Sequence, residues 1–153
     1  MNNTNKTFRK LIPNLFLLLT LWLMACSTDP EPIAFGEDHC SYCKMKIADP
    51  RFGGELVSSK GKVYKFDAME CLLPYLNESK EDEFAHILGI AYDDPGKLIA
   101  VENLNFAISE NYPSPMGAHL AGFRDQPTDG SKSLNWQALQ DQLSEFKPSN
   151  FRE

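Results

Sequence analysis

The sequence has little positive charge. Its 153 residues include 15 lysines and arginines against 21 aspartates and glutamates, and three of the basic residues lie within the first ten positions. From residue 26 onward the chain has 12 basic and 21 acidic residues, which gives a net charge of −9. Such a surface repels nucleic acid and anionic lipid headgroups, so we expect no nucleic-acid partner.

The signatures of the common enzyme classes are missing as well. No Ser-His-Asp pattern, phosphate-binding loop or paired-carboxylate motif stands out along the chain. The length suits one domain, or two very small ones, with a modest core. The sequence therefore predicts a small protein that is not an enzyme.

A long apolar run is also missing, although a short one is present. Residues 15–25 are apolar except for Thr20, and they follow a positively charged start. The run is too short to cross a bilayer core of about 30 Å comfortably as a permanent helix, and it has the proportions of a signal peptide. It ends in Leu23-Met24-Ala25-Cys26-Ser27, which resembles the lipobox of bacterial lipoproteins.

The lipobox predicts that residues 1–25 are removed and that Cys26 becomes a lipid-modified amino terminus. The alternative is ordinary signal cleavage that leaves a free thiol at Cys26. A lipid anchor attaches the protein to a membrane, facing the periplasm or on the outer membrane. Ser27 is not the aspartate that often retains lipoproteins at the inner membrane, which favours the outer membrane. Residues 26–36 are rich in proline and acidic residues, which predicts an extended, solvated tether.

Cysteine is scarce, and the few cysteines are placed unusually. Beyond Cys26 there are three, Cys40, Cys43 and Cys71, whereas disulfide-stabilised exported proteins more often have an even number. Two of them fall in the run His39-Cys40-Ser41-Tyr42-Cys43-Lys44-Met45, where the CxxC spacing aims both sulfurs at one point. Met45 adds a thioether, and a set of thiolates and thioethers selects copper(I) over calcium, magnesium or manganese. The cluster therefore predicts a copper(I) site.

Four further residues are candidates to complete this site, namely His39, Cys71, Met116 and His119. A proline before Met116 and a glycine after it would hold this side chain in a fixed turn. Each candidate also has a purely structural interpretation. His39 could be a solvent-exposed neighbour, Cys71 an inert buried thiol, and Met116 a core residue that fills a gap.

Two other functions compete with copper binding. Cys40, Cys43 and Cys71 with His39 or His119 could form a closed zinc site of the Cys₃His type, typical of a protein-interaction module. A thiol–disulfide oxidoreductase would use the CxxC alone. That motif belongs at the start of a helix after a strand, whereas here the cluster follows a proline-rich segment and ends at Asp49-Pro50.

The hydrophobic pattern allows two strand–strand–helix units. The first, residues 37–105, has a hairpin of residues 55–59 and 62–66 and then a helix with Asp67 as N-cap and Glu70 as the capping-box residue. It continues with a central strand at 84–92, a turn at 93–97 and a short strand at 98–101. The second unit, residues 106–147, has strands at 106–108 and up to Phe123, and a helix from Asn135 stopped by Pro148, before a tail at 148–153. The fold class is thus α+β, and a faint echo of Gly61 to Asp67 in Gly117 to Asp125 allows two related halves.

Three motifs resemble those of the NosL family of nitrous oxide reductase accessory proteins. They are Cys40-Ser-Tyr-Cys43-Lys-Met45, the run from Gly61 to Asp67 followed by Cys71, and Pro115-Met116-Gly117. With the lipobox, the resemblance extends from about Asp38 to Asp125 and covers most of the mature chain.

The resemblance implies a membrane-tethered, periplasmic copper(I) chaperone. It implies delivery of copper for the copper–sulfide centre of nitrous oxide reductase, with that enzyme and a copper-site ABC transporter as partners. It also implies a fold similar to that of organomercurial lyase, with two ββα halves. The motif residues it assigns to the metal are Cys40, Cys43, Met45 and Met116, and it supplies no role for Cys71.

Overall fold

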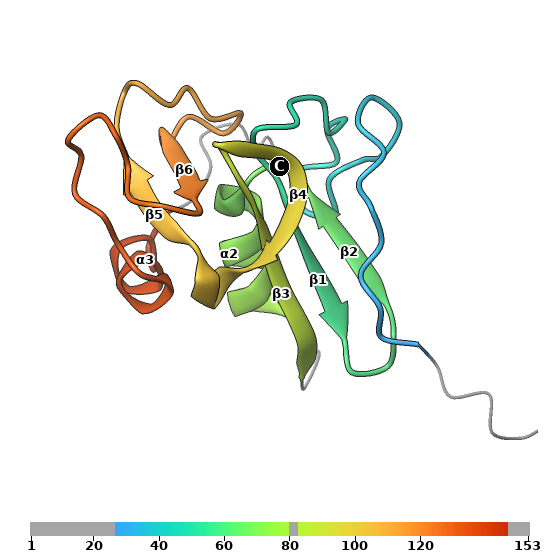
Figure 1. The fold of residues 1–153 in the computed structure, drawn as a ribbon. Helices are drawn as coiled ribbons and strands as arrows, with labels where there is room; N and C mark the ends of the chain where they lie inside the picture. The colour runs from blue at the N-terminus through green and yellow to red at the C-terminus, as the bar shows by residue number, and fades with distance from the viewer. Residues whose placement is uncertain (1–26, 80–82, 147–153) are drawn as a thin grey trace, which may run out of the picture.

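One mixed sheet organises the protein, as the computed structural model shows for residues 27–79 and 83–146 (Figure 1). Within these residues the sheet has six strands in the order β2-β1-β3-β6-β5, with β4 paired to β3. The predicted signal peptide, the lipidation site Cys26, Pro148 and the tail lie outside the described residues. No helix in the described part is both long enough and apolar enough to cross a membrane.

The first half begins with the predicted hairpin. Strands β1 (Gly54–Ser58) and β2 (Val63–Phe66) pair antiparallel, and helix α2 (Met69–Glu78) follows directly. Strand β3 (Phe84–Ala91) lies at the centre of the sheet and pairs antiparallel with β1 on one side and with β4 (Asp94–Ala100) on the other. This half therefore forms a four-stranded sheet that carries one helix.

The second half repeats the order strand, strand, helix. A short 3₁₀ turn, η1 (Val101–Asn103), leads to β5 (Asn105–Ile108), which pairs antiparallel with β6 (Leu120–Phe123), and α3 (Trp136–Gln142) closes the unit. Strand β6 runs parallel to β3 and pairs with it where Ala91 meets Gly122, so both halves share one sheet. The α+β class and the strand–strand–helix order are confirmed, and the likeness to organomercurial lyase stays a prediction.

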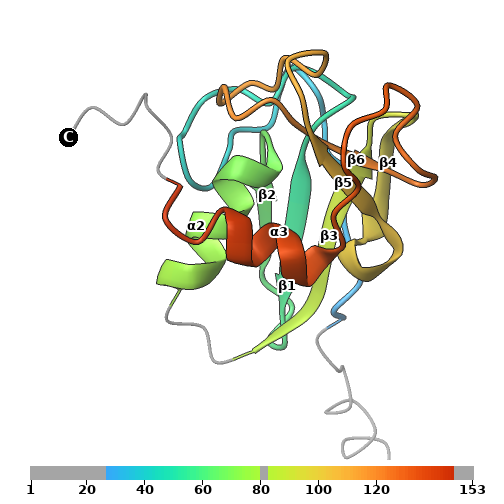
Figure 2. The ribbon, with the colours of Figure 1, turned by 90° about the vertical axis from the view of Figure 1, so that its left-hand side faces the viewer.

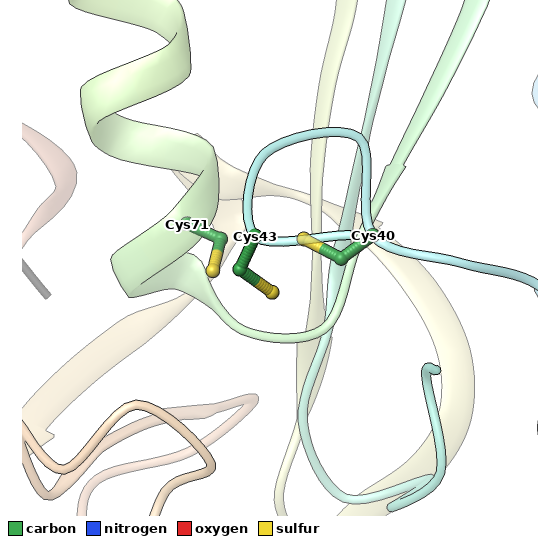
Figure 3. Close-up of side chains that lie close together, drawn as sticks. All are labelled: Cys40, Cys43 and Cys71. Atoms are coloured by element: carbon green, nitrogen blue, oxygen red, sulfur yellow. The ribbon is translucent and has the colours of Figure 1, made fainter. Parts of the chain in front are cut away.

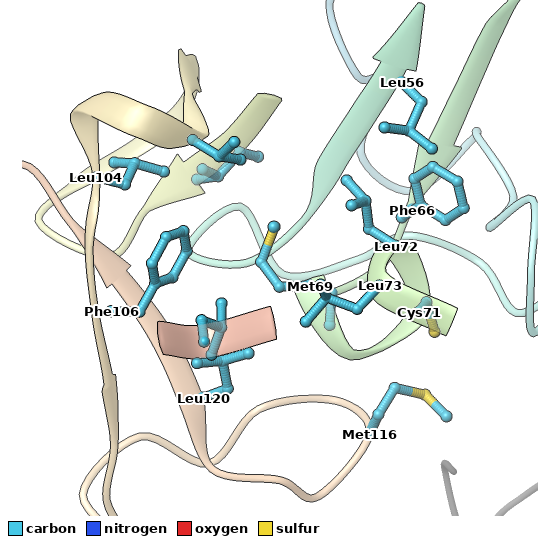
Figure 4. Packing of buried hydrophobic residues seen from close by; sticks show 14 of the residues in the cluster. Leu56, Phe66, Met69, Cys71, Leu72, Leu73, Leu104, Phe106, Met116 and Leu120 are labelled. Atoms are coloured by element: carbon cyan, nitrogen blue, oxygen red, sulfur yellow. The ribbon is translucent and has the colours of Figure 1, made fainter. Parts of the chain in front are cut away.

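Both helices pack into one hydrophobic core against the sheet (Figures 2 and 4). Its buried side chains include Leu56, Phe66, Met69, Leu72, Phe106, Leu120 and Leu139. Alternate residues of β5 and β6 instead join a second, smaller cluster with Phe52, Tyr112 and Phe123. The second hairpin therefore has buried side chains on both of its faces.

Two glycines let α2 approach the sheet closely. Gly54 and Gly89 are paired across β1 and β3, and the Met69 sulfur lies 3.2 and 3.1 Å from where their Cβ atoms would be. A Cβ at Gly54 would also lie 2.7 Å from Cδ1 of Leu72 and 2.8 Å from the carbonyl oxygen of Leu88. Because neither glycine has a side chain, α2 and its Cys71 can lie close to the sheet.

Three local predictions were wrong. The N-cap of α2 is Ala68 and no side chain caps the helix; Asp67 is buried beside the cysteine loop. The predicted turn at 93–97 is mostly strand, because the hairpin turn occupies only Tyr92 and Asp93. Pro95 is tolerated on this strand because an edge strand leaves backbone N–H positions unpaired. Helix α3 begins at the predicted Asn135 cap but ends at Gln142, well before Pro148.

The segment expected to be a solvated tether packs onto the domain from Glu31 onward. Ile33 is only 7% exposed and belongs to the main core. The backbone N–H of Glu31 donates to Glu55, and Lys65 Nζ donates to the Pro32 carbonyl oxygen at 2.9 Å. Burial of one isoleucine and these contacts outweigh the extended preference of the proline-rich composition, so a free tether can extend only as far as Pro30.

Glu55 gives the fold a pH dependence. This carboxyl group is fully buried on β1, and burial raises its pKa to about 7. An unfolded glutamate ionises near pH 4.5, so between about pH 4.5 and 7 the folded protein keeps a proton that the unfolded chain has lost. The contribution of Glu55 to stability is therefore complete below about pH 4.5 and is lost as the pH rises through about 7, at about 1.4 kcal/mol per pH unit at most.

We expect Glu55→Gln to remove this part of the pH dependence. The glutamine amide oxygen can still accept the Glu31 N–H, so the variant should fold. Urea unfolding at pH 5 and pH 8 should show wild type losing about 1–3 kcal/mol more than the variant between the two values. Equal losses would show that Glu55 ionises normally. Asp67, whose pKa burial raises to about 6, and Cys40, whose pKa is lowered to about 5, contribute with opposite signs but equally in both proteins, so the difference between the proteins isolates Glu55.

Candidate metal centre

Three cysteine thiols meet at the start of α2 (Figure 3). Cys40 and Cys43 lie on the loop of residues 39–46, which we call the metal loop, and Cys71 lies in the first turn of the helix. The three Sγ atoms lie within 4.8 Å of one another, and all three are free thiols. Three sulfurs each about 2.3 Å from one metal ion would be separated by about 4 Å, so small side-chain movements suffice to close the site.

Backbone hydrogen bonds shape the metal loop. The Cys40 N–H donates to the Met45 carbonyl at 2.8 Å, and the Lys44 N–H donates to the Cys40 carbonyl at 3.1 Å. Lys44, between Cys43 and Met45, has a φ of 65°. This left-handed backbone conformation turns the chain back toward Cys40. The Ser41 N–H donates to the carbonyl oxygen of Lys65 at 2.7 Å, which attaches the loop to β2. The sequence motif thus becomes a tight, fixed turn.

The protons of the three thiols are distributed unequally. The Cys71 thiol donates a hydrogen bond to the Cys40 sulfur and, with backbone N–H groups of Asp67, Cys43 and Tyr42, lowers the pKa of Cys40 to about 5. The same hydrogen bond keeps the proton on Cys71 and raises its pKa, and burial raises the pKa of Cys43. At neutral pH the metal-free site therefore holds one thiolate and two thiols. A metal ion must displace the two remaining protons, so its affinity rises with pH.

The low pKa of Cys40 depends on the neighbouring thiol of Cys71. We expect the ultraviolet absorbance of thiolate in the metal-free protein to titrate near pH 5, and Cys71→Ala to move this midpoint upward by about 1–2 pH units, because it removes a hydrogen-bond donor to the thiolate. Cys71→Ser retains a donor and should shift the midpoint less. A midpoint that is the same in all three proteins would mean that the backbone N–H groups alone stabilise the thiolate.

The other predicted ligands lie in different surroundings. Met45 is on the metal loop with its side chain 41% exposed, whereas Met116 is 2% exposed and belongs to the same core cluster as Cys71 (Figure 4). Met45 and Met116 stay predicted ligands.

The two candidate histidines lie apart from the thiol cluster. His39 is exposed and forms a β-bridge with Lys46. His119 has a φ of 56°, and its Nδ1 atom is buried without a hydrogen-bond partner. Neither histidine joins the group of metal-ligand side chains found in the described residues, which contains only the three cysteines.

The sequence did not reveal a buried link between α2 and the loop that carries Met116. Glu70 is fully buried, and its carboxylate accepts a hydrogen bond from the hydroxyl group of Ser114. Ser114 Oγ also accepts the N–H of Leu120 at 3.3 Å. The carboxylate thus holds residues 114–120 against the turn that bears Cys71. The sequence did place Glu70 on the buried face of the helix, three residues before the core residue Leu73. That spacing indicates burial of Glu70, but it does not identify Ser114 as its hydrogen-bond partner.

Together, the fold and the cluster define a small α+β domain with a three-thiol group able to bind a metal ion. The sequence profile of the NosL family matches residues 32–130, and the chain belongs to this family. The fold is similar to that in the crystal structure of the copper chaperone NosL from Shewanella denitrificans, with a TM-score of 0.61 and 17% sequence identity over 72% of this chain and 95% of that chain. No curated protein matches the sequence.

Proposed function

We propose that this protein is a lipid-anchored copper(I) chaperone that delivers copper for the assembly of nitrous oxide reductase. The observation that carries the proposal is the cluster of three thiols without a fourth histidine, cysteine or carboxylate ligand among the described residues. A soft, three-coordinate donor set suits copper(I), whereas structural zinc sites almost always have four ligands. Membership in the NosL family and the copper chaperone of similar fold support the same metal.

The burial of the three sulfurs suggests how copper leaves. Cys40 and Cys71 are fully buried, whereas Cys43 is half-buried at the open side of the cluster. A ligand of the acceptor protein would bond to copper from this side as the Cys43 sulfur leaves. The raised pKa of Cys43 favours uptake of a proton by the departing sulfur, which makes the exchange harder to reverse. Exposed Met45, on the same loop, provides a thioether at the surface through which the ion can pass.

The anchor and the partners complete the proposal. Lipid on Cys26 would hold the domain at a membrane, facing the periplasm or on the outer membrane, with residues up to Pro30 as the free tether. Nitrous oxide reductase is the proposed acceptor, and a copper-site ABC transporter is a further proposed partner. These assignments rest on the lipobox and on the family.

A transfer experiment tests delivery. Anaerobic protein of residues 27–153 carrying one copper(I) ion is mixed with copper-free nitrous oxide reductase from the same bacterium. We expect the enzyme to regain activity faster than it does in a chelator buffer set to the same free copper concentration. Equal rates would show that the protein only buffers copper. Purification with one equivalent of zinc, and no exchange for copper(I), would instead favour a structural zinc module.

A further inference from the structure

The charges of this acidic protein are segregated around the metal loop. Residues 40–66, which include the metal loop and the β1–β2 hairpin, contain six basic and two acidic residues, a net charge of +4. The rest of the chain from residue 27 onward contains six basic and nineteen acidic residues, a net charge of −13. Basic residues are therefore concentrated in the stretch of sequence that carries the metal loop; of these, Arg51 is paired with Asp49 and Lys65 with Glu31 and Asp38.

A groove lies next to the metal loop, between this basic stretch and the end of α2. It has a volume of about 560 Å³ and is lined by Ser41, Tyr42, Lys60, Tyr64, Tyr75, Glu78 and Ser79. Tyr42 and Ser41 are the two residues between Cys40 and Cys43, so one wall of the groove is the cysteine loop itself. The ring centroids of Tyr64 and Tyr75, which also line the groove, are 5.0 Å apart; Tyr64 is only 7% exposed, whereas Tyr75 is half-buried.

One lysine lines the groove, and two more contact residues that line it. Lys60 lines it at the turn between β1 and β2, and the ammonium group of Lys62 lies 4.6 Å from the centre of the Tyr64 ring. Lys44 folds back over the metal loop, where its ammonium group donates to the carbonyl oxygen of Ser41 at 2.6 Å. Glu78 is the single carboxylate among the lining residues, and it accepts a hydrogen bond from the Tyr42 hydroxyl group at 3.4 Å.

We propose that this groove is the docking site for the protein that accepts the copper ion, and that it recognises a surface segment with clustered carboxylates around an apolar or aromatic side chain. The half-buried rings of Tyr42 and Tyr75 offer aromatic contacts of the kind enriched in interface cores, and lysines beside the groove attract a partner of opposite charge and orient it during approach. Because one wall is the metal loop, a partner seated in the groove lies beside Cys43. This inference rests on the proposed function and adds the kind of partner surface that the site takes.

A protein partner fits these features better than an anionic membrane does. The mature chain carries a net charge of −9, which opposes adsorption of the domain to negatively charged lipid. A groove walled by the cysteine loop suits a protruding segment, and only a protein offers ligands that can take the ion.

Two double variants with the same net charge separate docking from overall charge. Lys60→Glu with Lys62→Glu reverses the rim of the groove, and Lys97→Glu with Lys132→Glu reverses two exposed lysines on β4 and in the loop before α3. None of the four residues belongs to the metal cluster, so both variants should bind copper(I) with the affinity of wild type. At low salt we expect copper transfer to copper-free nitrous oxide reductase to slow about tenfold in the groove variant and less than about twofold in the control. The difference should shrink as salt rises.

A cross-linking experiment on the copper-free proteins tests the contact directly. A carbodiimide joins a lysine amine to a carboxylate of a bound protein as an amide, and the water lost converts the reagent to a urea. With copper-free nitrous oxide reductase as the probe, we expect cross-links at Lys60 or Lys62 that survive Cys40→Ser. No cross-link, or cross-links only at lysines outside residues 40–66, would overturn the inference. So would equal slowing of transfer in the two double variants.

Two further outcomes are informative. Binding of wild type to phosphatidylglycerol vesicles that is lost in the groove variant, with transfer unchanged, would overturn the inference in favour of a membrane-facing surface. Wild type that fails to bind copper(I) would refute the proposed function, yet the cross-linking result on copper-free proteins would still decide where the partner docks. The two failures are therefore distinguishable.

Discussion

Replacement of Cys71 by serine is expected to weaken copper(I) binding by at least about a hundredfold, or about 2.7 kcal/mol. The Cys71 sulfur is fully buried and lies within 4.8 Å of those of Cys40 and Cys43. A serine hydroxyl group has nearly the same shape, but it is a hard ligand that does not ionise at neutral pH, so copper(I) loses one of three soft donors. Anaerobic titration against a competing copper(I) chelator measures the change.

Met45→Ala is the matched control for this experiment. It removes a sulfur from the metal loop, but the thioether is neutral and its side chain is 41% exposed, so we expect a loss of less than about tenfold. Thermal unfolding of the metal-free variants should show that Cys71→Ser still folds. A folded Cys71→Ser protein with wild-type affinity would mean that Cys71 is an inert core thiol and that the site consists of Cys40, Cys43 and the methionines.

Gly54→Ala is expected to destabilise the fold by about 2–4 kcal/mol, the cost of overpacking a core. The new Cβ atom would lie 2.8 Å from a backbone oxygen of β3 and 2.7 Å from Leu72, so either the strand or α2 must move. Movement of α2 carries Cys71 away from the metal loop, so copper(I) affinity should fall as well. Urea unfolding and the chelator titration together report both effects.

Gly130→Ala separates overpacking from the general cost of replacing a glycine. Its φ of 80° strains any other residue, but a Cβ atom there meets nothing within 4 Å. We expect a loss of about 1 kcal/mol and unchanged copper affinity. If Gly54→Ala were no more costly than this control, the close approach of α2 to the sheet would not position Cys71.

Local patterns in the sequence predicted the elements of the first half well. Alternation in residues 62–66 predicted a strand, and the helical spacing of Met69, Leu72 and Leu73 predicted a helix; both are confirmed. Each pattern arises because a single element turns one face to the core. The predicted family and fold class are confirmed too. The family could be predicted because the cysteine motif and the Pro-Met-Gly motif are each a short run of consecutive residues.

The features that depend on long-range packing could not be predicted. Cys71 was a candidate ligand by residue type, but its position beside Cys40 and Cys43 depends on the close approach of α2 to the paired glycines of β1 and β3, which no pattern near Cys71 predicts. Asp67 fits a helix cap by residue type, but the neighbouring Cys40 loop buries it before the helix begins. Glu70 was assigned to the same cap, whereas its partner Ser114 lies 44 residues away.

X-ray absorption of the copper(I)-loaded protein tests the three-thiol site most directly. With one copper ion per chain, we expect a first shell of three sulfur atoms, reduced to two in Cys71→Ser. The variant without Cys40, Cys43 and Cys71 should retain no copper in competition with the chelator. A shell with nitrogen ligands that is unchanged by Cys71→Ser, or full copper binding after all three thiols are removed, would contradict the three-thiol copper site.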